Sequence, residues 1–249
     1  MSKKEKSITR YSQSVEQNGI CKKIKIFIDK AKDAYDLSPH SQIVFSSTAF
    51  LSEASASPVE TEENIFELLR DIAELFPDLH AIMILKNPDF FESSDDFEFM
   101  RAQIRALFRA AVYGNFSILC ERVQSRWEYE RFSNLINKIF CELESESREF
   151  NGYIQKGILI SSPLSAFCAP DCTADFFCID LDRFLELMAG ASAPPNHIRR
   201  ESLASLSRIF NSAPPNKKIK LALFSSNLAP DVCELAEICG ACEIWLKNN

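Results

Sequence analysis

The stretch Asp175-Phe-Phe-Cys-Ile-Asp-Leu-Asp-Arg183 decides the fold, because a short apolar segment in it is followed at once by a cluster of charge. A segment this apolar is typical of a strand buried in the interior, and the change to charged residues marks the end at which the strand reaches solvent. In barrel enzymes, catalytic groups stand at the carboxyl ends of such strands. The segment therefore predicts a buried strand that carries Asp180, Asp182 and Arg183 to the mouth of a barrel.

An alternation of apolar strands and helices extends along the whole chain. Apolar residues at helical spacing predict helices over 61–76, 97–112, 127–146, 198–210 and 229–238. Eight strands alternating with helices are typical of a closed (β/α)8 barrel of the TIM type, in the α/β class. Three residues follow the last strand, so we expect the barrel to lack its last helix. The predicted strands are Ile24–Ile28, Gln42–Phe45, His80–Leu85, Phe116–Cys120, Gly157–Ile160, Asp175–Ile179, Ile219–Phe224 and Cys242–Leu246.

Three arginines recur on one side of the helix predicted over 97–112. Arg101, Arg105 and Arg109 lie four residues apart, and apolar residues such as Ile104 and Phe108 occupy the other side. A charged stripe opposite an apolar stripe is typical of a helix with one face in solvent. We therefore interpret the three arginines as the exposed face of this helix.

The composition is that of a folded, acidic protein. The 249 residues are 46% hydrophobic and carry a net charge of −7, with a pI near 5.2. The basic residues are scattered, which argues against nucleic-acid binding, and no apolar run is long enough to span a bilayer or to form a signal sequence. We expect residues 1–20 to be a disordered or linker tail, residues 21–249 to form the barrel domain, and the protein to be cytoplasmic.

Nine cysteines are many for this length, but their number is odd and most of them lie among apolar residues. In a reducing compartment such cysteines are small buried hydrophobic side chains. Cys168 and Cys172 flank Ala-Pro-Asp, and Cys233 precedes the pair Cys239 and Cys242. A zinc site usually needs two such pairs or nearby histidines, and the chain has three histidines in all. We predict no metal site, with metal binding by the second cluster as the minor alternative.

Five segments resemble, in the same order, the motifs of one enzyme family. Ser47-Thr-Ala-Phe-Leu51 is similar to the family's Arg-Thr-Glu-Phe-Leu motif, and Arg101–Cys120 resembles its arginine-rich helix with the following glycine and strand. Gly157–Pro163, Asp175–Phe184 and Leu223–Asp231 resemble three further strand ends. The family is the phosphoenolpyruvate (PEP)-utilising barrel, found in enzyme I of the bacterial sugar phosphotransferase system and in pyruvate phosphate dikinase. The resemblance covers nearly the whole chain.

The resemblance implies a PEP-binding barrel with phosphotransferase activity, and it also shows which active-site residues differ. The family uses arginines for the phosphate, a glutamate and an aspartate for magnesium, and a cysteine as the acid. At the matching positions this chain has Ser47 for an arginine, Ser161 for the metal-binding glutamate and Ser225 for the cysteine. Asp182-Arg183 replaces the Asn-Asp pair, so a cation stands where the family has a metal-binding aspartate. We therefore expect no catalytic residues, no cofactor and no phosphoryl transfer.

Two positions keep part of the family's character. Lys86 stands for the arginine of its Arg-Thr-Met-Asp motif, and Asp89 stands for the aspartate of that motif. The resemblance thus defines a candidate pocket at the former site, made of Ser47, Lys86, Asp89, Ser161, Asp182, Arg183, Ser225 and Asn227.

A plainer interpretation is that the charged residues at the strand ends form a solvated rim, with Arg183 paired to Asp180 or Asp182. This rim consists of Lys86, Glu121, Arg122, Asp180, Asp182 and Arg183.

Loss of the family's ligands together with retention of the barrel pattern favours a non-catalytic binding or regulatory module. The alternative is an enzyme with altered chemistry on a small carboxylate or phosphate, which would use Lys86, Asp182 and Arg183. In a third hypothesis, the barrel wall left uncovered by the missing helix causes self-association. The expected partner is therefore an unidentified protein or a small anionic metabolite, with no nucleic acid and no membrane.

Overall fold

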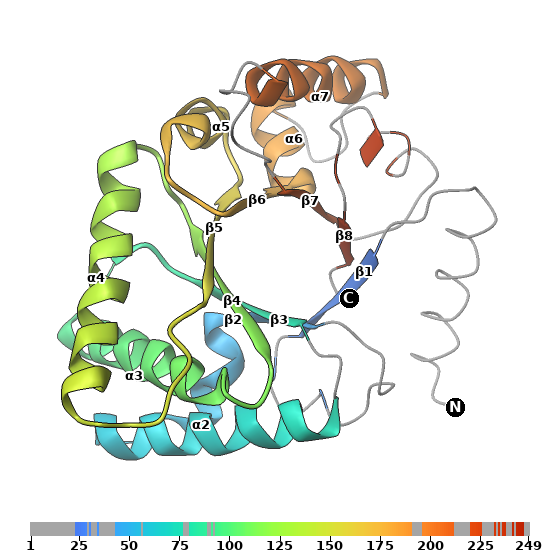
Figure 1. Ribbon diagram of the computed structural model, residues 1–249. Helices are drawn as coiled ribbons and strands as arrows, with labels where there is room; N and C mark the ends of the chain where they lie inside the picture. The colour runs from blue at the N-terminus through green and yellow to red at the C-terminus, as the bar shows by residue number, and fades with distance from the viewer. Residues whose placement is uncertain are drawn as a thin grey trace.

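The chain folds into a closed barrel of eight parallel strands in the order β1 to β8, in which β8 pairs with β1 (Figure 1). This arrangement confirms the predicted (β/α)8 class. The computed structural model describes residues 23–28, 30, 34, 43–55, 57–76, 80–88, 91, 93–190, 196–211, 220–225, 232, 234, 236–237, 241 and 243–246. The strands are β1 Lys23–Ile28, β2 Ile43–Ser46, β3 His80–Leu85, β4 Asn115–Glu121, β5 Gln155–Ile160, β6 Phe176–Asp180, β7 Lys220–Ser225 and β8 Glu243–Leu246.

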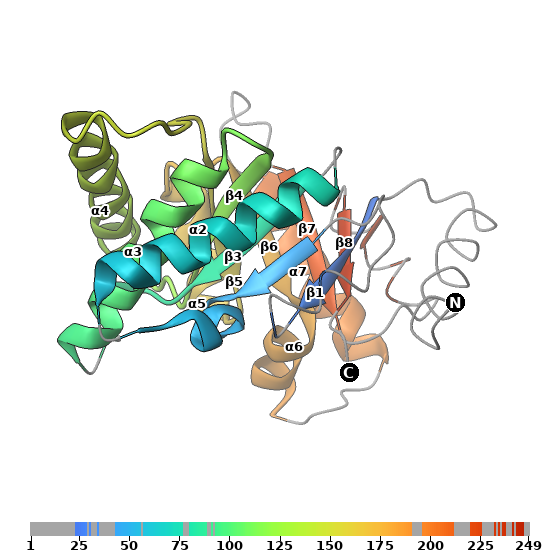
Figure 2. The ribbon, with the colours of Figure 1, turned by 90° about the horizontal axis from the view of Figure 1, so that it is seen from below.

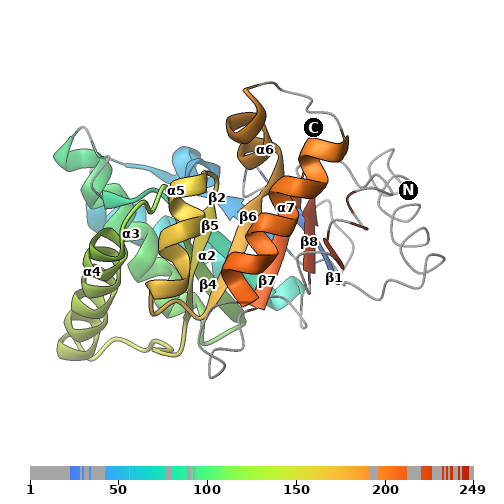
Figure 3. The ribbon, with the colours of Figure 1, turned by 90° about the horizontal axis from the view of Figure 1, so that it is seen from above.

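Helices surround the barrel on its outside. Figures 1 and 2 show α2, α3 and α4 around the half of the barrel that contains β2 to β5, and Figure 3 shows α5, α6 and α7 side by side near β5, β6 and β7. No helix in the described ranges is long and apolar enough to cross a bilayer. The helices are η2 Ser47–Glu53, α2 Pro58–Leu75, α3 Ser94–Ala110, α4 Arg126–Ser145, α5 Pro163–Cys168, η4 Ala169–Asp171, α6 Leu181–Ala189 and α7 Asn196–Asn211.

Side-chain caps set where the helices begin after the strands. Ser125 accepts a hydrogen bond from the backbone N–H of Glu128 at 3.2 Å and opens α4, and Ser162 opens α5 through a reciprocal capping box with Ser165. Such caps satisfy backbone N–H groups that have no partner within the helix, and each stabilises the helix by about 1 kcal/mol. The sequence analysis missed α5 and α6, because helices of six and nine residues are too short to establish a helical period.

Two apolar layers follow from the period of two along each strand. One set of alternating side chains packs outward against the helices, as Ile118 and Ile158 do. The other set fills the barrel interior and forms a separate buried cluster. Its members are Val44, Ile82, Ile84, Leu119, Leu159, Phe176, Cys178 and Ala222.

The interpretation of the arginine stripe as a solvent face is wrong. The Arg109 side chain is 8% exposed and that of Arg105 is 12% exposed, because both lie between α3 and the neighbouring helices. Arg109 donates to Glu62 at 2.9 Å and to Glu63 at 2.9 Å, both on α2, and Arg105 bonds Glu62 and donates to Glu146 at 2.6 Å. The stripe therefore joins α2 and α3 to the end of α4.

Other predictions fall partly or wholly outside the described residues. These are the tail over 1–20, most of the helix predicted over 229–238, and the cluster of Cys233, Cys239 and Cys242. The described residues end with β8, and no helix follows it among them.

Candidate functional site

Strand parity brings four polar side chains to the inner side of one end of the barrel. Ile84, Leu119, Leu159 and Cys178 point into the barrel interior, and the residue two positions further on each strand shares their direction. The residues so placed are Lys86, Glu121, Ser161 and Asp180. They stand at the carboxyl ends of β3, β4, β5 and β6, which is the end where barrel enzymes place their active sites.

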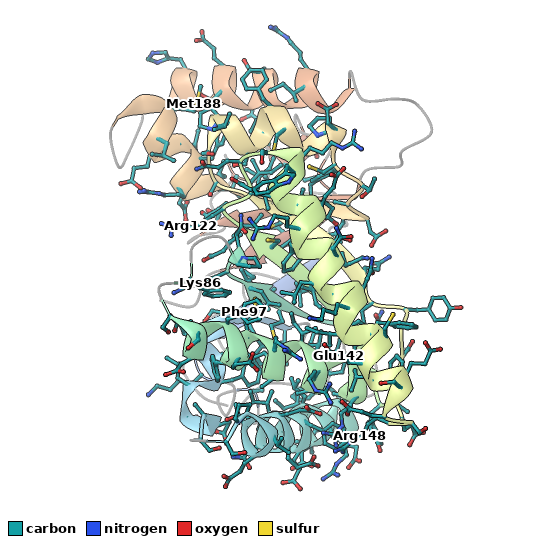
Figure 4. The ribbon with its side chains drawn as sticks, turned by 90° about the vertical axis from the view of Figure 1, so that its left-hand side faces the viewer. Lys86, Phe97, Arg122, Glu142, Arg148 and Met188 are labelled. Carbon is teal, nitrogen blue, oxygen red and sulfur yellow. The ribbon has the colours of Figure 1, made fainter. Side chains whose placement is uncertain are left out.

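Glu121 interacts with three other charged groups at this mouth. Burial raises the pKa of its carboxyl group above the usual 4.5, the cations Arg122 and Lys86 act in the opposite direction, and the Asp180 carboxylate adds to the increase. These four charged groups are therefore close enough to influence one another. Figure 4 shows Lys86 and Arg122 on the same edge of the molecule, far from Arg148 near the end of α4.

The backbone beside Glu121 adopts a conformation that is uncommon for a side-chain-bearing residue. Arg122 has a φ of 60°, in the left-handed region. The side chain of Asn87, 1% exposed, donates to the Arg122 carbonyl at 3.5 Å and to Glu128 at 3.4 Å. Glu128 also accepts the backbone N–H of Gln124 at 2.6 Å. These contacts hold the loop after β4, so the loop presents Arg122 at a defined place.

The charged residues after β6 lie on a helix and face other partners. Asp180 caps α6 by accepting the backbone N–H of Arg183 at 3.2 Å. The Arg183 side chain is 53% exposed and pairs with Glu186 at 2.6 Å, one turn along α6. The predicted pairing of the Arg183 side chain with Asp180 or Asp182 is therefore replaced by the pair with Glu186. Asp182 accepts the hydroxyl of Ser225 at 3.1 Å.

The structure thus divides the predicted pocket. Lys86 and Ser161 lie at the inner mouth, whereas Asp182, Arg183 and Ser225 lie at the junction of α6 and β7. The side chain of Ser47, at the start of η2, and the residues Asp89 and Asn227 lie outside the described part of the structure.

Glu121 belongs to this inner mouth and Arg122 follows it in the loop after β4, although the sequence analysis placed both only in the solvated rim. Two signals were available in the sequence. One is the period of two from Leu119 to Glu121, and the other is the position of both residues directly at the end of a buried strand.

A groove of about 300 Å³ lies at the opposite end of the barrel. It is lined by Tyr113, Asn115, Asn151 and Tyr153, among other residues, near the amino end of β4. None of the predicted pocket residues contributes to it, and none of its lining residues is charged.

Comparison with known families relates the central part of the chain to one of them. Residues 92–182 match the family described as PEP-utilising enzyme, PEP-binding domain. The match confirms the predicted resemblance for this part of the chain, whereas the motifs at 47–51 and 223–231 lie outside it. The match includes Glu121, Ser161 and Asp180 and ends at Asp182, so Lys86, Arg183 and Ser225 lie outside it.

The similar curated proteins agree with this relationship. Phosphoenolpyruvate-protein phosphotransferase from Haemophilus influenzae is 32% identical over 86 residues, which are 33% of this chain and 15% of that protein. The same-named protein from Buchnera aphidicola is 34% identical over 89 residues, 35% of this chain and 16% of that protein. The matched segments therefore span about one sixth of the length of these relatives.

Solved structures support the barrel fold over nearly the whole chain. Malate synthase from Haloferax volcanii, as its lead(II) complex, has a TM-score of 0.59 at 12% identity, covering 91% of this chain and 70% of that one. A HpcH/HpaI aldolase/citrate lyase family protein from Burkholderia cenocepacia has a TM-score of 0.60 at 8% identity, covering 91% and 88%. At these identities the likeness concerns the fold alone.

Proposed function

We propose that this relative of the PEP-binding domain binds a small carboxylate or phosphate anion at the barrel mouth and does not catalyse phosphoryl transfer. The observation that carries the proposal is that two cations, Lys86 and Arg122, act electrostatically on the half-buried Glu121 at the barrel mouth. Both cations act on the same carboxyl group, so their positive charges are felt at one place on the barrel mouth. An incoming carboxylate or phosphate would be attracted by both charges.

The residues at the family's metal position do not fit a magnesium ion. Magnesium takes six oxygen ligands and prefers carboxylates. The matching positions offer the Ser161 hydroxyl, the Asp182 carboxylate and the Arg183 cation, and Asp182 already accepts the Ser225 hydroxyl. Ser225 is also a far weaker acid than the family's cysteine. Without the metal and the acid, we expect the stabilisation of a transferring phosphoryl group to be lost.

Binding is tested by titrating the protein with PEP and, separately, with inorganic phosphate by isothermal calorimetry. Lys86→Ala and Arg122→Ala should each weaken the binding at least about tenfold, which corresponds to about 1.4 kcal/mol. Arg183→Ala is the matched control, because it removes the same charge from an exposed side chain that already pairs with Glu186. Equal weakening by all three substitutions, or no binding of either anion, would contradict the proposal.

The absence of catalysis needs its own assay. The protein is incubated with PEP, magnesium and a separately prepared phosphohistidine-carrying domain of enzyme I, and phosphorylation of that domain is followed by mass spectrometry. We expect no transfer above the level without protein. Clear transfer would overturn this half of the proposal while leaving the anion site standing.

The raised pKa of Glu121 also supports a second candidate function, proton transfer to or from a bound carboxylate. A half-buried carboxyl group that interacts with cations in a barrel mouth is suited to act as a general acid or base. The test is exchange of the methyl protons of pyruvate in deuterium oxide, followed by NMR. Exchange that requires Glu121, and that Glu121→Gln removes without loss of pyruvate binding, would establish this activity. Exchange equal to that of buffer would reject it.

A further inference from the structure

Two cysteines meet where the barrel turns from α5 into β6. Cys168 is the last residue of α5, and Cys172 follows the short helix η4. The two residues are four positions apart, and the Cys172 sulfur lies 3.3 Å from the Cys168 carbonyl oxygen. The local fold therefore places the two cysteine side chains next to each other.

The contacts of the two thiols show that they share one small site. The Cys172 thiol donates to the Cys168 carbonyl at 3.3 Å, and it lies close enough to the Cys168 sulfur to lower the pKa of that thiol. The Cys168 thiol contacts the carbonyl oxygens of Ser165 at 3.6 Å and Val123 at 4.0 Å. Cys172 is fully buried, whereas Cys168 is partly exposed, and both are free thiols. A solute would thus reach Cys168 first.

We propose that Cys168 and Cys172 are a redox modification site, in which a peroxide oxidises Cys168 and Cys172 then closes a disulfide with it. The proposal is based on the different exposure of the two thiols. The partly exposed Cys168 meets the oxidant, and the buried Cys172 then completes the disulfide. It is independent of the anion site described above, because neither cysteine lies at the inner mouth.

The reaction is balanced with a hydroperoxide as the oxidant. The Cys168 thiolate attacks one peroxide oxygen, the O–O bond breaks, and the leaving oxygen departs as water after taking a proton, which leaves a sulfenic acid on Cys168. The Cys172 sulfur then attacks the Cys168 sulfur, the S–S bond forms, and the S–O bond breaks with loss of a second water. Overall, two thiols and one hydrogen peroxide give one disulfide and two waters.

The electrostatic surroundings agree with Cys168 as the first nucleophile. The hydrogen bond from Cys172 lowers the pKa of the Cys168 thiol, although burial and the carboxylates of Glu128 and Asp171 oppose this effect. A lowered pKa increases the fraction of thiolate, which is the reactive form. The site thus favours oxidation of Cys168 over that of an ordinary cysteine.

Formation of the Cys168–Cys172 disulfide would also affect the anion site. The disulfide removes the Cys168 S–H group that faces the Val123 carbonyl, and Val123 directly follows Arg122. A change in this contact would loosen the loop that presents Arg122. This consequence rests on the proposed anion binding, whereas formation of the disulfide does not.

The test is oxidation of the full-length protein with hydrogen peroxide, followed by proteolysis without reduction and mass spectrometry. The expected result is a peptide in which Cys168 and Cys172 are joined, with loss of two hydrogen atoms that dithiothreitol restores. In Cys172→Ser the sulfenic acid at Cys168 should persist and react with dimedone. Cys168→Ser should protect Cys172 from oxidation, because the oxidant does not reach the buried thiol.

Cys141→Ser is the matched control, since it removes an exposed cysteine from α4 and should leave the disulfide unchanged. Oxidation of Cys168 to a sulfinic acid without a link to Cys172, or a link to another cysteine, would overturn the proposal. Peptide mapping of the unmodified sequence gives this answer even if a variant fails to fold. If the disulfide forms but anion affinity stays the same, only the connection to Arg122 fails.

Discussion

The hydroxyl of Ser225, at the end of β7, donates a hydrogen bond to the Asp182 carboxylate near the start of α6, at 3.1 Å. Ser225 is 1% exposed, and its strand neighbour Ala222 points into the barrel three residues earlier. Ser225 therefore points away from the interior, between β7 and α6. Two residues that the predicted motifs place at the family's reaction site are thus bonded to each other, and the bond joins α6 to β7.

This bond predicts a structural role for Ser225. Ser225→Ala leaves the Asp182 carboxylate without this partner, so the free energy of unfolding should fall by about 1–2 kcal/mol in urea denaturation. Ser205→Ala is the control, because Ser205 donates to the Glu201 carbonyl on the exposed side of α7 and its loss should cost less than about 0.5 kcal/mol. Equal effects of the two substitutions would contradict this role.

Glu121 predicts a pH-dependent stability. Burial raises its pKa in the folded state above 4.5, so the folded protein binds the proton more tightly than the unfolded chain. The contribution of Glu121 to stability is therefore complete below pH 4.5 and is lost as the pH rises above the folded-state pKa. Glu121→Gln should raise the melting temperature at pH 7, and the gain should shrink towards pH 4.5. The exposed Glu237 provides the control, and Glu237→Gln should show no such trend.

The buried end of the arginine stripe should contribute more to stability than its exposed end. Arg109→Ala leaves Glu62, 7% exposed at its side chain, with one cation fewer and also removes the guanidinium 4.0 Å above the Phe66 ring. Loss of one partner from a buried ion pair costs about 3–5 kcal/mol. Arg101→Ala breaks a 2.7 Å pair with Glu142, in which both side chains are 26% exposed, and should cost about 1 kcal/mol or less. Urea denaturation of the two variants measures the difference.

The close packing around Gly157 predicts the effect of a larger side chain in the barrel interior. A Cβ atom at this position would lie 2.7 Å from the Phe176 ring and 2.8 Å from Leu119, both in the barrel interior. Gly157→Ala should therefore destabilise the protein by about 1–3 kcal/mol through overpacking. Gly190 has a φ of +63°, and outside its own helix no atom of the described residues lies within 4 Å of a Cβ atom added there. Gly190→Asn should be nearly neutral in the same assay, since asparagine tolerates this backbone conformation.

The strands were predictable from the sequence because their signal is local. The predicted Phe116–Cys120 and His80–Leu85 correspond to β4 and β3 within one residue at each end, since runs of buried apolar residues end where charge or glycine begins. The helix predicted over 127–146 likewise corresponds to α4. The family motifs placed Lys86 and Ser161 in the candidate pocket, and the structure puts both at the inner mouth. The importance of Glu121 followed only from its burial in the structure.

The sequence alone determined the barrel and the ends of its strands, because both depend on residue type and on spacing within a short segment. It also predicted, through the family motifs, that residues of the family's active site are replaced. The tertiary structure decided which polar groups meet. Arg109 pairs with Glu62, which is 47 positions away in the sequence, and Asp182 bonds Ser225, which is 43 positions away. Glu121 interacts with Lys86, which follows the neighbouring strand. Such partners come together only when the chain folds, and burial then strengthens the interaction between their charges.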